Sequence, residues 1–236
     1  QTVTLNADGT FNITGDGQTE TKNFTYTAKD SFGHTDIGFV NINSIPCFVA
    51  GTAIRTPNGE VAVETLRPGD LVMTQDDGPQ PLRSIGRCTV AATGSFAPVH
   101  ISAGTFGQHR DLMVTPLHRT LIHDSLSELL FGETEVLVAA RDLVNDSSVR
   151  YTTGGEVTYV HLLFDCHQVV FSKGLATQSF LPDPQTAKSF EAEILAEICA
   201  FFPEIDPETG SGYTLAARRT LRALEAQLLF ASRKAA

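Results

Sequence analysis

Cys47 stands where the composition of this 236-residue chain changes from polar and Thr-rich to rich in β-branched residues. A thiolate attacks carbonyl carbons when its pKa is lowered or when a neighbouring base takes its proton. The carbonyl group directly before Cys47 belongs to Pro46. Attack there requires a polarised carbonyl, a proton for the departing nitrogen of Cys47, and a peptide held in a bent or twisted form. These two residues therefore mark a candidate bond for cleavage of the chain by its own thiol.

A Thr-x-x-His segment holds groups suited to two of these tasks. Thr115 offers a hydroxyl or a backbone donor to the peptide, and His118 follows later in the same segment. An imidazole has an ordinary pKa of about 6.5, so His118 can shuttle a proton near neutral pH. Pro46 lacks an N–H, and the peptide bond before it has a low cis penalty, which is compatible with a strained approach. The alternative for Cys47 is structural, since free cysteines are often buried as small apolar side chains.

Three ordered blocks of the sequence resemble the Hint (Hedgehog/intein) family, in the bacterial form attached to secreted proteins. The first block begins at Cys47 and reads CFVAGTAIRTPNGEVAVETLRPGDLVMT. The second, DLMVTPLHR at residues 111–119, contains the Thr-x-x-His segment, and the third is YVHLLFDCHQVVFSKGL at residues 159–175. The resemblance implies a mostly β, horseshoe-like Hint fold for residues 47–181.

The resemblance implies a chemical reaction, an N-to-S acyl shift at Pro46–Cys47. The peptide bond becomes a thioester that links residues 1–46 to the Cys47 side chain, and a second nucleophile then releases them. By the family pattern, Cys47 is the nucleophile, His118 protonates the leaving amine, and Thr115 orients the peptide or binds the oxyanion. The chain would thus be a single-turnover, cysteine-dependent self-processing domain whose substrate is its own upstream polypeptide.

The closing block carries the family position that usually holds a polar catalyst. By the resemblance this position falls on His161, which would assist activation of the thiol or the second step. Asp165 competes for that role, because the alignment there depends on one gap. His161 can also be a side chain that one face of a strand simply displays. A zinc site of His118, His161, Cys166 and His167 is a further alternative, but the spacing matches no standard zinc pattern, and we expect no metal and no cofactor.

The end of the matching region departs from the family pattern. Splicing inteins end with a His-Asn pair, and cyclisation of the Asn cuts the second junction. Here residues 176–182 read ATQSFLP, and no Asn stands between Asn145 and the C-terminus. Gln178 could cyclise only slowly and out of position. We therefore expect cleavage before Cys47 without splicing, closer to Hedgehog processing, with water or an amine or thiol as the acceptor.

Residues 1–46 are expected to be β structure that belongs to an upstream module. Apolar residues alternate on both sides of the turn signal Asp8-Gly9, as in a hairpin. Residues 23–42, NFTYTAKDSFGHTDIGFVNI, resemble the last strands of immunoglobulin-like and cadherin-like repeats of bacterial surface proteins. The alternative is a generic β meander. We expect this segment to be released on cleavage.

Residues 47–181 form the predicted Hint domain and residues 182–236 a helical extension. Short β-branched runs separated by turn signals predict an all-β module, with short helical turns over 124–131 and 139–144. Helical spacing then predicts one helix over about 190–202. It predicts a second helix whose apolar face is formed by Leu215, Leu221, Leu224, Leu228 and Leu229, with a solvated basic face.

The composition excludes some function classes. The formal net charge of −10 argues against a general nucleic-acid binder, which needs clustered Lys and Arg. No apolar run approaches the roughly 18 residues of a membrane span, and there is no basic-then-apolar leader, as expected for a fragment of a longer precursor. The family context implies a secreted or cell-surface location. The rival to self-cleavage is an inactive secreted adhesion or interaction module with a Hint fold.

Overall fold

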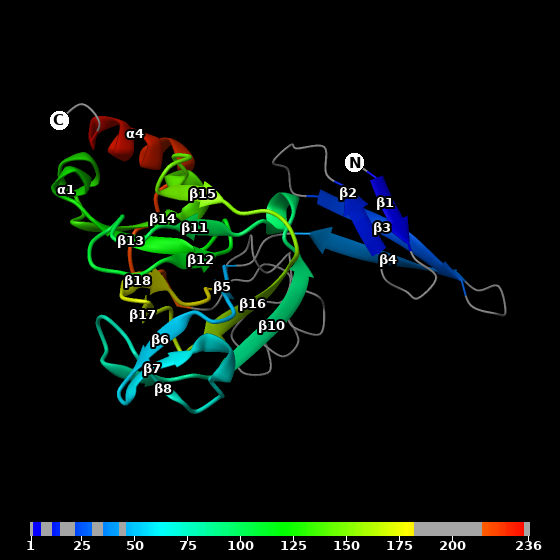
Figure 1. Ribbon diagram of the computed structural model, residues 1–236, viewed down its shortest axis with the longest axis horizontal. Coiled ribbons are helices and arrows are strands. Elements are labelled where there is room, and N and C mark those ends of the chain that lie inside the picture. Colours follow the sequence, from blue (N-terminus) through cyan, green and yellow to red (C-terminus); the bar gives the residue numbers. More distant parts are fainter. Residues whose placement is uncertain are drawn as a thin grey trace.

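Residues 46–181 build two six-stranded antiparallel sheets that share one core (Figure 1). The structure, a computed structural model, describes residues 46–181 and 214–230 in full, and the backbone alone of 2–5, 11–14, 22–29, 35–42 and 231–233. In sheet order, the first sheet is β10 (Ser84–Ala91), β16 (Glu156–Leu163), β5 (Phe48–Val49), β12 (Leu112–Val114), β11 (Val99–Ile101) and β15 (Val149–Tyr151). The second sheet is β14 (Glu135–Ala139), β13 (Arg119–His123), β18 (Leu175–Gln178), β17 (Val169–Ser172), β6 (Ala53–Thr56) and β7 (Gly59–Ala62).

Short connections complete this module. A two-stranded ribbon joins β8 (Leu71–Met73) to β9 (Pro79–Pro81), and α1 (Ser125–Phe131) begins after Asp124, whose side chain accepts a hydrogen bond from the backbone N–H of Leu126. Three 3₁₀ turns cover Val63–Thr65, Gly94–Phe96 and Ala140–Leu143. The predicted all-β module and its two short helical turns are thus confirmed.

The alternation of side chains along β16 decides what each face of the first sheet carries. Val160 and Leu162 are buried in the main core, beside Phe48 of β5 and Val114 of β12. Successive side chains of a strand point to opposite faces, so Tyr159 and His161 project from the other face. The core side therefore holds the sheet in place, and the opposite side carries Tyr159 and His161.

The N-terminal strands form two antiparallel hairpins. β1 (Thr2–Leu5) pairs with β2 (Phe11–Thr14), and β3 (Lys22–Lys29) pairs with β4 (Thr35–Ile42). The predicted hairpin around Asp8-Gly9 is confirmed by this register. The immunoglobulin-like or cadherin-like character of residues 1–46 stays a prediction.

The C-terminal residues do not begin their helix where the leucine spacing predicted. Residues 219–221 pair with β14, where the N–H of Leu137 donates to the carbonyl of Arg219 at 2.8 Å and the N–H of Leu221 donates to that of Leu137 at 2.9 Å. The helix α4 (Ala223–Arg233) follows and buries Ala226 and Leu229 in the main core. Pairing with the edge strand satisfies the backbone that a longer helix would have used.

The predicted apolar helix face is therefore only partly correct. Leu221 and Leu229 are buried, but Leu224 and Leu228 are 78% and 51% exposed, and Leu215 lies outside the helix. Arg218 belongs to the extended segment, not to a basic helix face, and its guanidinium pairs with Asp76 and Glu135, each at 2.7 Å. The helix predicted over about 190–202 lies outside the described residues. Among those described, no helix is long and apolar enough to cross a membrane.

Candidate active site

Strand register places three of the predicted residues in one row across the first sheet. In the antiparallel pair β5·β16, Val49 lies opposite Tyr159 and Phe48 opposite Val160. One further step in this register places Cys47 beside His161. In the pair β5·β12, Phe48 lies opposite Val114, and the next step places Cys47 beside Thr115. Side chains of cross-strand neighbours lie on the same face of a sheet, so Thr115, Cys47 and His161 form a row.

Two backbone groups of Cys47 are bonded to Thr115. The N–H of Cys47, which is the nitrogen of the candidate scissile bond, donates to Thr115 Oγ1 at 2.8 Å. The N–H of Thr115 donates to the carbonyl of Cys47 at 3.0 Å, and the Thr115 hydroxyl contacts the same carbonyl at 3.4 Å. Both residues are buried. The threonine therefore fixes the orientation of the peptide group that would be cleaved.

His118 lies in the turn that begins at Thr115, and its N–H donates to the carbonyl of Thr115 at 3.1 Å. Its side chain is 1% exposed, and its ring lies edge-on to that of Phe48, with 4.4 Å between the ring centroids. Neither ring nitrogen has a hydrogen-bond partner in the described part of the protein. Burial, with smaller electrostatic contributions from Arg119 and His167, lowers the pKa of His118 to about 3. The imidazole is thus neutral at pH 7, with both nitrogens available.

The thiol of Cys47 lies in an apolar environment. The side chain is 6% exposed and packs in a cluster with Val49, Ala92, Val157 and Tyr159. Burial, and to a smaller degree the nearby Cys88, raises the pKa of the Cys47 thiol well above its ordinary value. The sequence left open whether a lowered pKa or a neighbouring base would activate this thiol. Since the thiol is protonated here, activation requires a base.

His161 and Asp165, the two candidates from the closing block, lie in different surroundings. His161 is partly buried in the row with Cys47, and burial lowers the pKa of its imidazole to about 4. Asp165 is exposed after the end of β16, where its carboxylate accepts hydrogen bonds from Arg83 Nε and Nη2, the latter at 2.7 Å. Of the two candidates, only His161 therefore lies at the strand position next to Cys47 in the register.

The Hint domain family model matches residues 46–184, more than half of the chain. This chain belongs to the Hint domain family. Its structure is similar to the bacterial intein-like domain from Clostridium thermocellum, at 16% identity over 58% of this chain and 99% of that chain, with a TM-score of 0.40. It is also similar to the MchDnaB-1 intein, at 13% identity over 56% of this chain and 98% of that chain, with a TM-score of 0.37. A third similar structure is the gp41-1 intein, at 12% identity over 57% of this chain and 98% of that chain, with a TM-score of 0.36. No curated protein matches the chain.

The other polar residues singled out by the sequence have separate partners. Cys166 accepts a hydrogen bond from Gln168 Nε2 at 3.0 Å, and His167 Nδ1 accepts one from the backbone of Ala217 at 2.9 Å. Gln178 is buried, and its Oε1 accepts from Arg119 at 3.2 Å. Within the ranges that the structure describes, no group of three or more His, Cys, Asp or Glu side chains could hold a metal ion.

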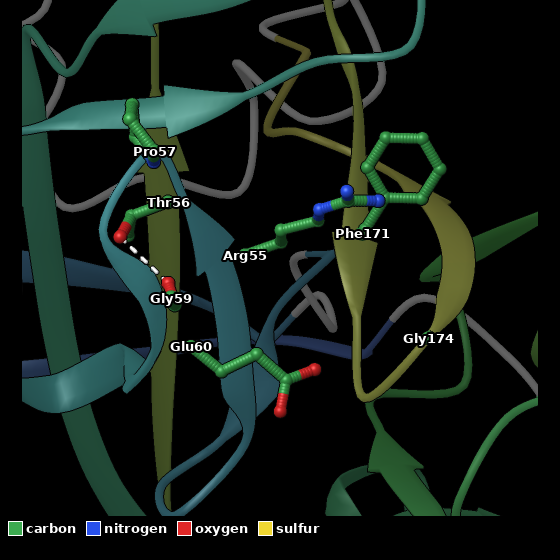
Figure 2. A pocket seen from close by; sticks show the side chains of 7 residues that line it. All are labelled: Arg55, Thr56, Pro57, Gly59, Glu60, Phe171 and Gly174. Carbon is green, nitrogen blue, oxygen red and sulfur yellow. Dashed lines mark hydrogen bonds between the residues drawn. The ribbon is translucent and has the colours of Figure 1, made fainter.

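A hollow on the surface of the Hint domain lies apart from the row. It has a volume of about 540 Å³ and is lined by the β6–β7 hairpin and the end of β17 (Figure 2). The guanidinium of Arg55 lies over the ring of Phe171 at 5.5 Å, as Figure 2 shows, and Glu60 lies on the hairpin. None of the predicted site residues lines this hollow. The candidate site is therefore separate from this hollow.

The two neutral imidazoles of the Hint domain predict a loss of stability in acid. The pKa values of His118 and His161 are about 3 and about 4 in the folded protein, whereas in the unfolded chain both return to about 6.5. Below pH 6.5 the unfolded state therefore binds more protons than the folded state. The contribution of these histidines to the free energy of unfolding should be fully present above about pH 6.5. As the pH decreases from there, the free energy of unfolding should fall by up to about 1.4 kcal/mol per pH unit for each histidine.

Urea denaturation between about pH 7.5 and about pH 4.5 measures this slope, above the range in which most carboxylates titrate. His118→Leu removes one titrating group and should flatten the curve. A slope that is the same in the wild type and in His118→Leu would contradict the assignment of a buried, neutral His118.

Proposed function

We propose that this Hint domain cleaves its own chain at the Pro46–Cys47 bond by an N-to-S acyl shift, followed by attack of a second nucleophile on the thioester. The family is one of self-processing domains. The observation that supports this bond most directly is the 2.8 Å hydrogen bond from the Cys47 nitrogen to Thr115 Oγ1, beside a buried thiol and a buried imidazole.

In the first step the Cys47 sulfur forms a bond to the carbonyl carbon of Pro46, and the thiol proton passes to His161, its neighbour in the row. The carbonyl electron pair moves to oxygen. The tetrahedral intermediate then collapses and the bond to the Cys47 nitrogen breaks. Water takes the thiol proton from His161 and supplies the proton that His118 delivers to the nitrogen, so both imidazoles end neutral and in sum one proton moves from sulfur to nitrogen.

The leaving nitrogen must receive its proton before the bond breaks, because an amide anion is a very poor leaving group. His118 supplies this proton in the proposal. The environment that lowers its pKa to about 3 makes the imidazolium form a strong acid once a proton reaches it. Thr115 keeps the nitrogen oriented throughout, through the hydrogen bond that it accepts in the resting state.

In the second step water, an amine or a thiol attacks the thioester and releases residues 1–46. The remaining fragment begins at Cys47 with a free amine, so the domain acts once. No Asn follows Asn145, so no carboxamide of that type is present to cut a second junction, and splicing is not part of the proposal. The resemblance to bacterial surface repeats and Hedgehog-like processing supports a secreted or cell-surface location.

The test is incubation of the purified chain with dithiothreitol at neutral pH. Fragments of 46 and 190 residues, which together make up the 236 of the chain, should accumulate with time. N-terminal sequencing of the larger fragment should begin at Cys47. Cys166→Ala is the matched control, since Cys166 follows the end of β16 outside the row and contacts Gln168, and it should cleave at the wild-type rate. A chain that stays intact with the thiol would instead indicate an inactive interaction module.

A further inference from the structure

The imidazole of His161 lies directly on the backbone of a glycine. Gly86 of β10 is the cross-strand partner of His161 in the pair β10·β16. A Cβ atom added at Gly86 would lie 2.0 Å from Cε1 of His161, 2.3 Å from Nε2 and 2.9 Å from Nδ1. Non-bonded atoms do not approach so closely, and the atoms involved belong to a rigid ring. Only glycine therefore leaves room for this ring.

Phe180 covers the imidazole from another side. The two ring centroids are 5.2 Å apart and the planes are tilted by 47°. Phe180 is 1% exposed, and its N–H donates to the carbonyl of Leu162 at 2.9 Å. The preceding Ser179 is tied to Gln168 through both its N–H and its hydroxyl oxygen, at 2.7 and 2.9 Å. The segment after β18 thus returns to β16 and holds Phe180 against His161.

These contacts substitute for a hydrogen bond. A catalytic imidazole is commonly oriented by a third polar group. Among the described residues none forms a hydrogen bond with the His161 ring, so packing alone sets its orientation. A ring that is free to turn would spend less time with a nitrogen facing the sulfur, and a misplacement of about 1 Å can cost about 100-fold in rate.

We propose that Gly86 and Phe180 are positioning residues, which form a slot that fixes the His161 imidazole in the row with Cys47. This inference rests on the proposed function, because it gives His161 the thiol proton. Gly86 acts through the absence of a side chain and Phe180 through its ring face. Neither residue touches the reacting atoms.

A double-mutant cycle tests the slot. Gly86→Ala should slow thiol-dependent cleavage about 100-fold in the wild type, because the added methyl group displaces the ring. In a His161→Ala background the same change should alter the residual rate by less than about twofold, because the ring is gone. Ser84→Thr adds one methyl group to the same strand and should leave the rate unchanged. An equal loss in both backgrounds, or no loss in the wild type, would overturn the proposal.

Unfolding separates failure of the slot from failure of the proposed function. Gly86→Ala should lower the urea midpoint in the wild type and not in the His161→Ala background, where space is available. Phe180→Leu, which keeps most of the buried volume, should weaken this coupling between positions 86 and 161. If the wild type does not cleave, the proposed function is wrong, and this cycle alone decides whether the slot exists. If the effects of Gly86→Ala and His161→Ala on the urea midpoint are additive, the slot does not exist.

Discussion

The Cys47→Ala chain should remain intact in dithiothreitol under conditions in which the wild type separates into its two fragments. No other described sulfur lies in the row: Cys88 lies opposite Tyr159 on β10, and Cys166 follows the end of β16. Without the Cys47 sulfur there is no atom to accept the acyl group from Pro46. The loss should therefore be complete, and gel electrophoresis over several days measures it.

Cys47→Ser gives the graded counterpart of this prediction. A hydroxyl occupies almost the same space but is a weaker nucleophile, so slow cleavage through an ester is expected. Its product should respond to hydroxylamine more than to a thiol. Persistent wild-type cleavage in Cys47→Ala would show that the bond breaks by a route that does not involve this residue.

Replacement of His118 should have the second-largest effect. His118→Gln keeps most of the buried volume in contact with Phe48, but its amide cannot exchange a proton. The cleavage rate should fall by about 10²- to 10⁴-fold, the usual contribution of a general acid or base. Single-turnover time courses measure the rate, and urea denaturation verifies that the variant is folded.

The control for His118 is His100→Gln, since His100 is a partly buried histidine on β11 of the same sheet. It should cleave at the wild-type rate. If His118→Gln cleaves as fast as this control while both are folded, then another group protonates the leaving nitrogen, and the proposed role of His118 is wrong.

The strands and several members of the candidate site could be predicted from local patterns. The alternation of apolar residues in β16 and the turn signals around β6 and β7 indicated an all-β module. Strands form where such alternation places apolar side chains on one face of the sheet and polar side chains on the other. Cys47, Thr115 and His118 followed from the type and spacing of residues. Their roles in the reaction stay predictions, while the family assignment is confirmed by the match over residues 46–184.

The features that depend on tertiary contacts could not be predicted in this way. The raised pKa of Cys47 results from burial against Ala92 and two residues of β16, which lie far from Cys47 in the sequence. The ion pair with Arg83 that occupies Asp165 joins residues 82 positions apart. Gly86 had one local signal, since a glycine inside a strand-forming run often marks a close approach, but its partner His161 is identified only by register.

The helical extension shows the same limit. Leucine spacing predicted a helix that includes Leu215, but the helix begins at Ala223, because residues before it pair with the free edge of β14. The spacing of apolar residues predicts which side of a helix is apolar. It does not reveal whether an edge strand will take the backbone hydrogen bonds that the helix would need. Within the helix Leu224 is exposed and Ala226 is buried.

The central claim is that the acyl group of Pro46 passes to the sulfur of Cys47, and hydroxylamine tests it most directly. Hydroxylamine attacks thioesters rapidly at neutral pH and leaves ordinary peptide bonds unchanged on this timescale. Mass spectrometry of the treated chain should show residues 1–46 ending in a hydroxamate at Pro46, together with a fragment that starts at Cys47. A single intact mass, or a fragment that ends at another residue, would contradict the account.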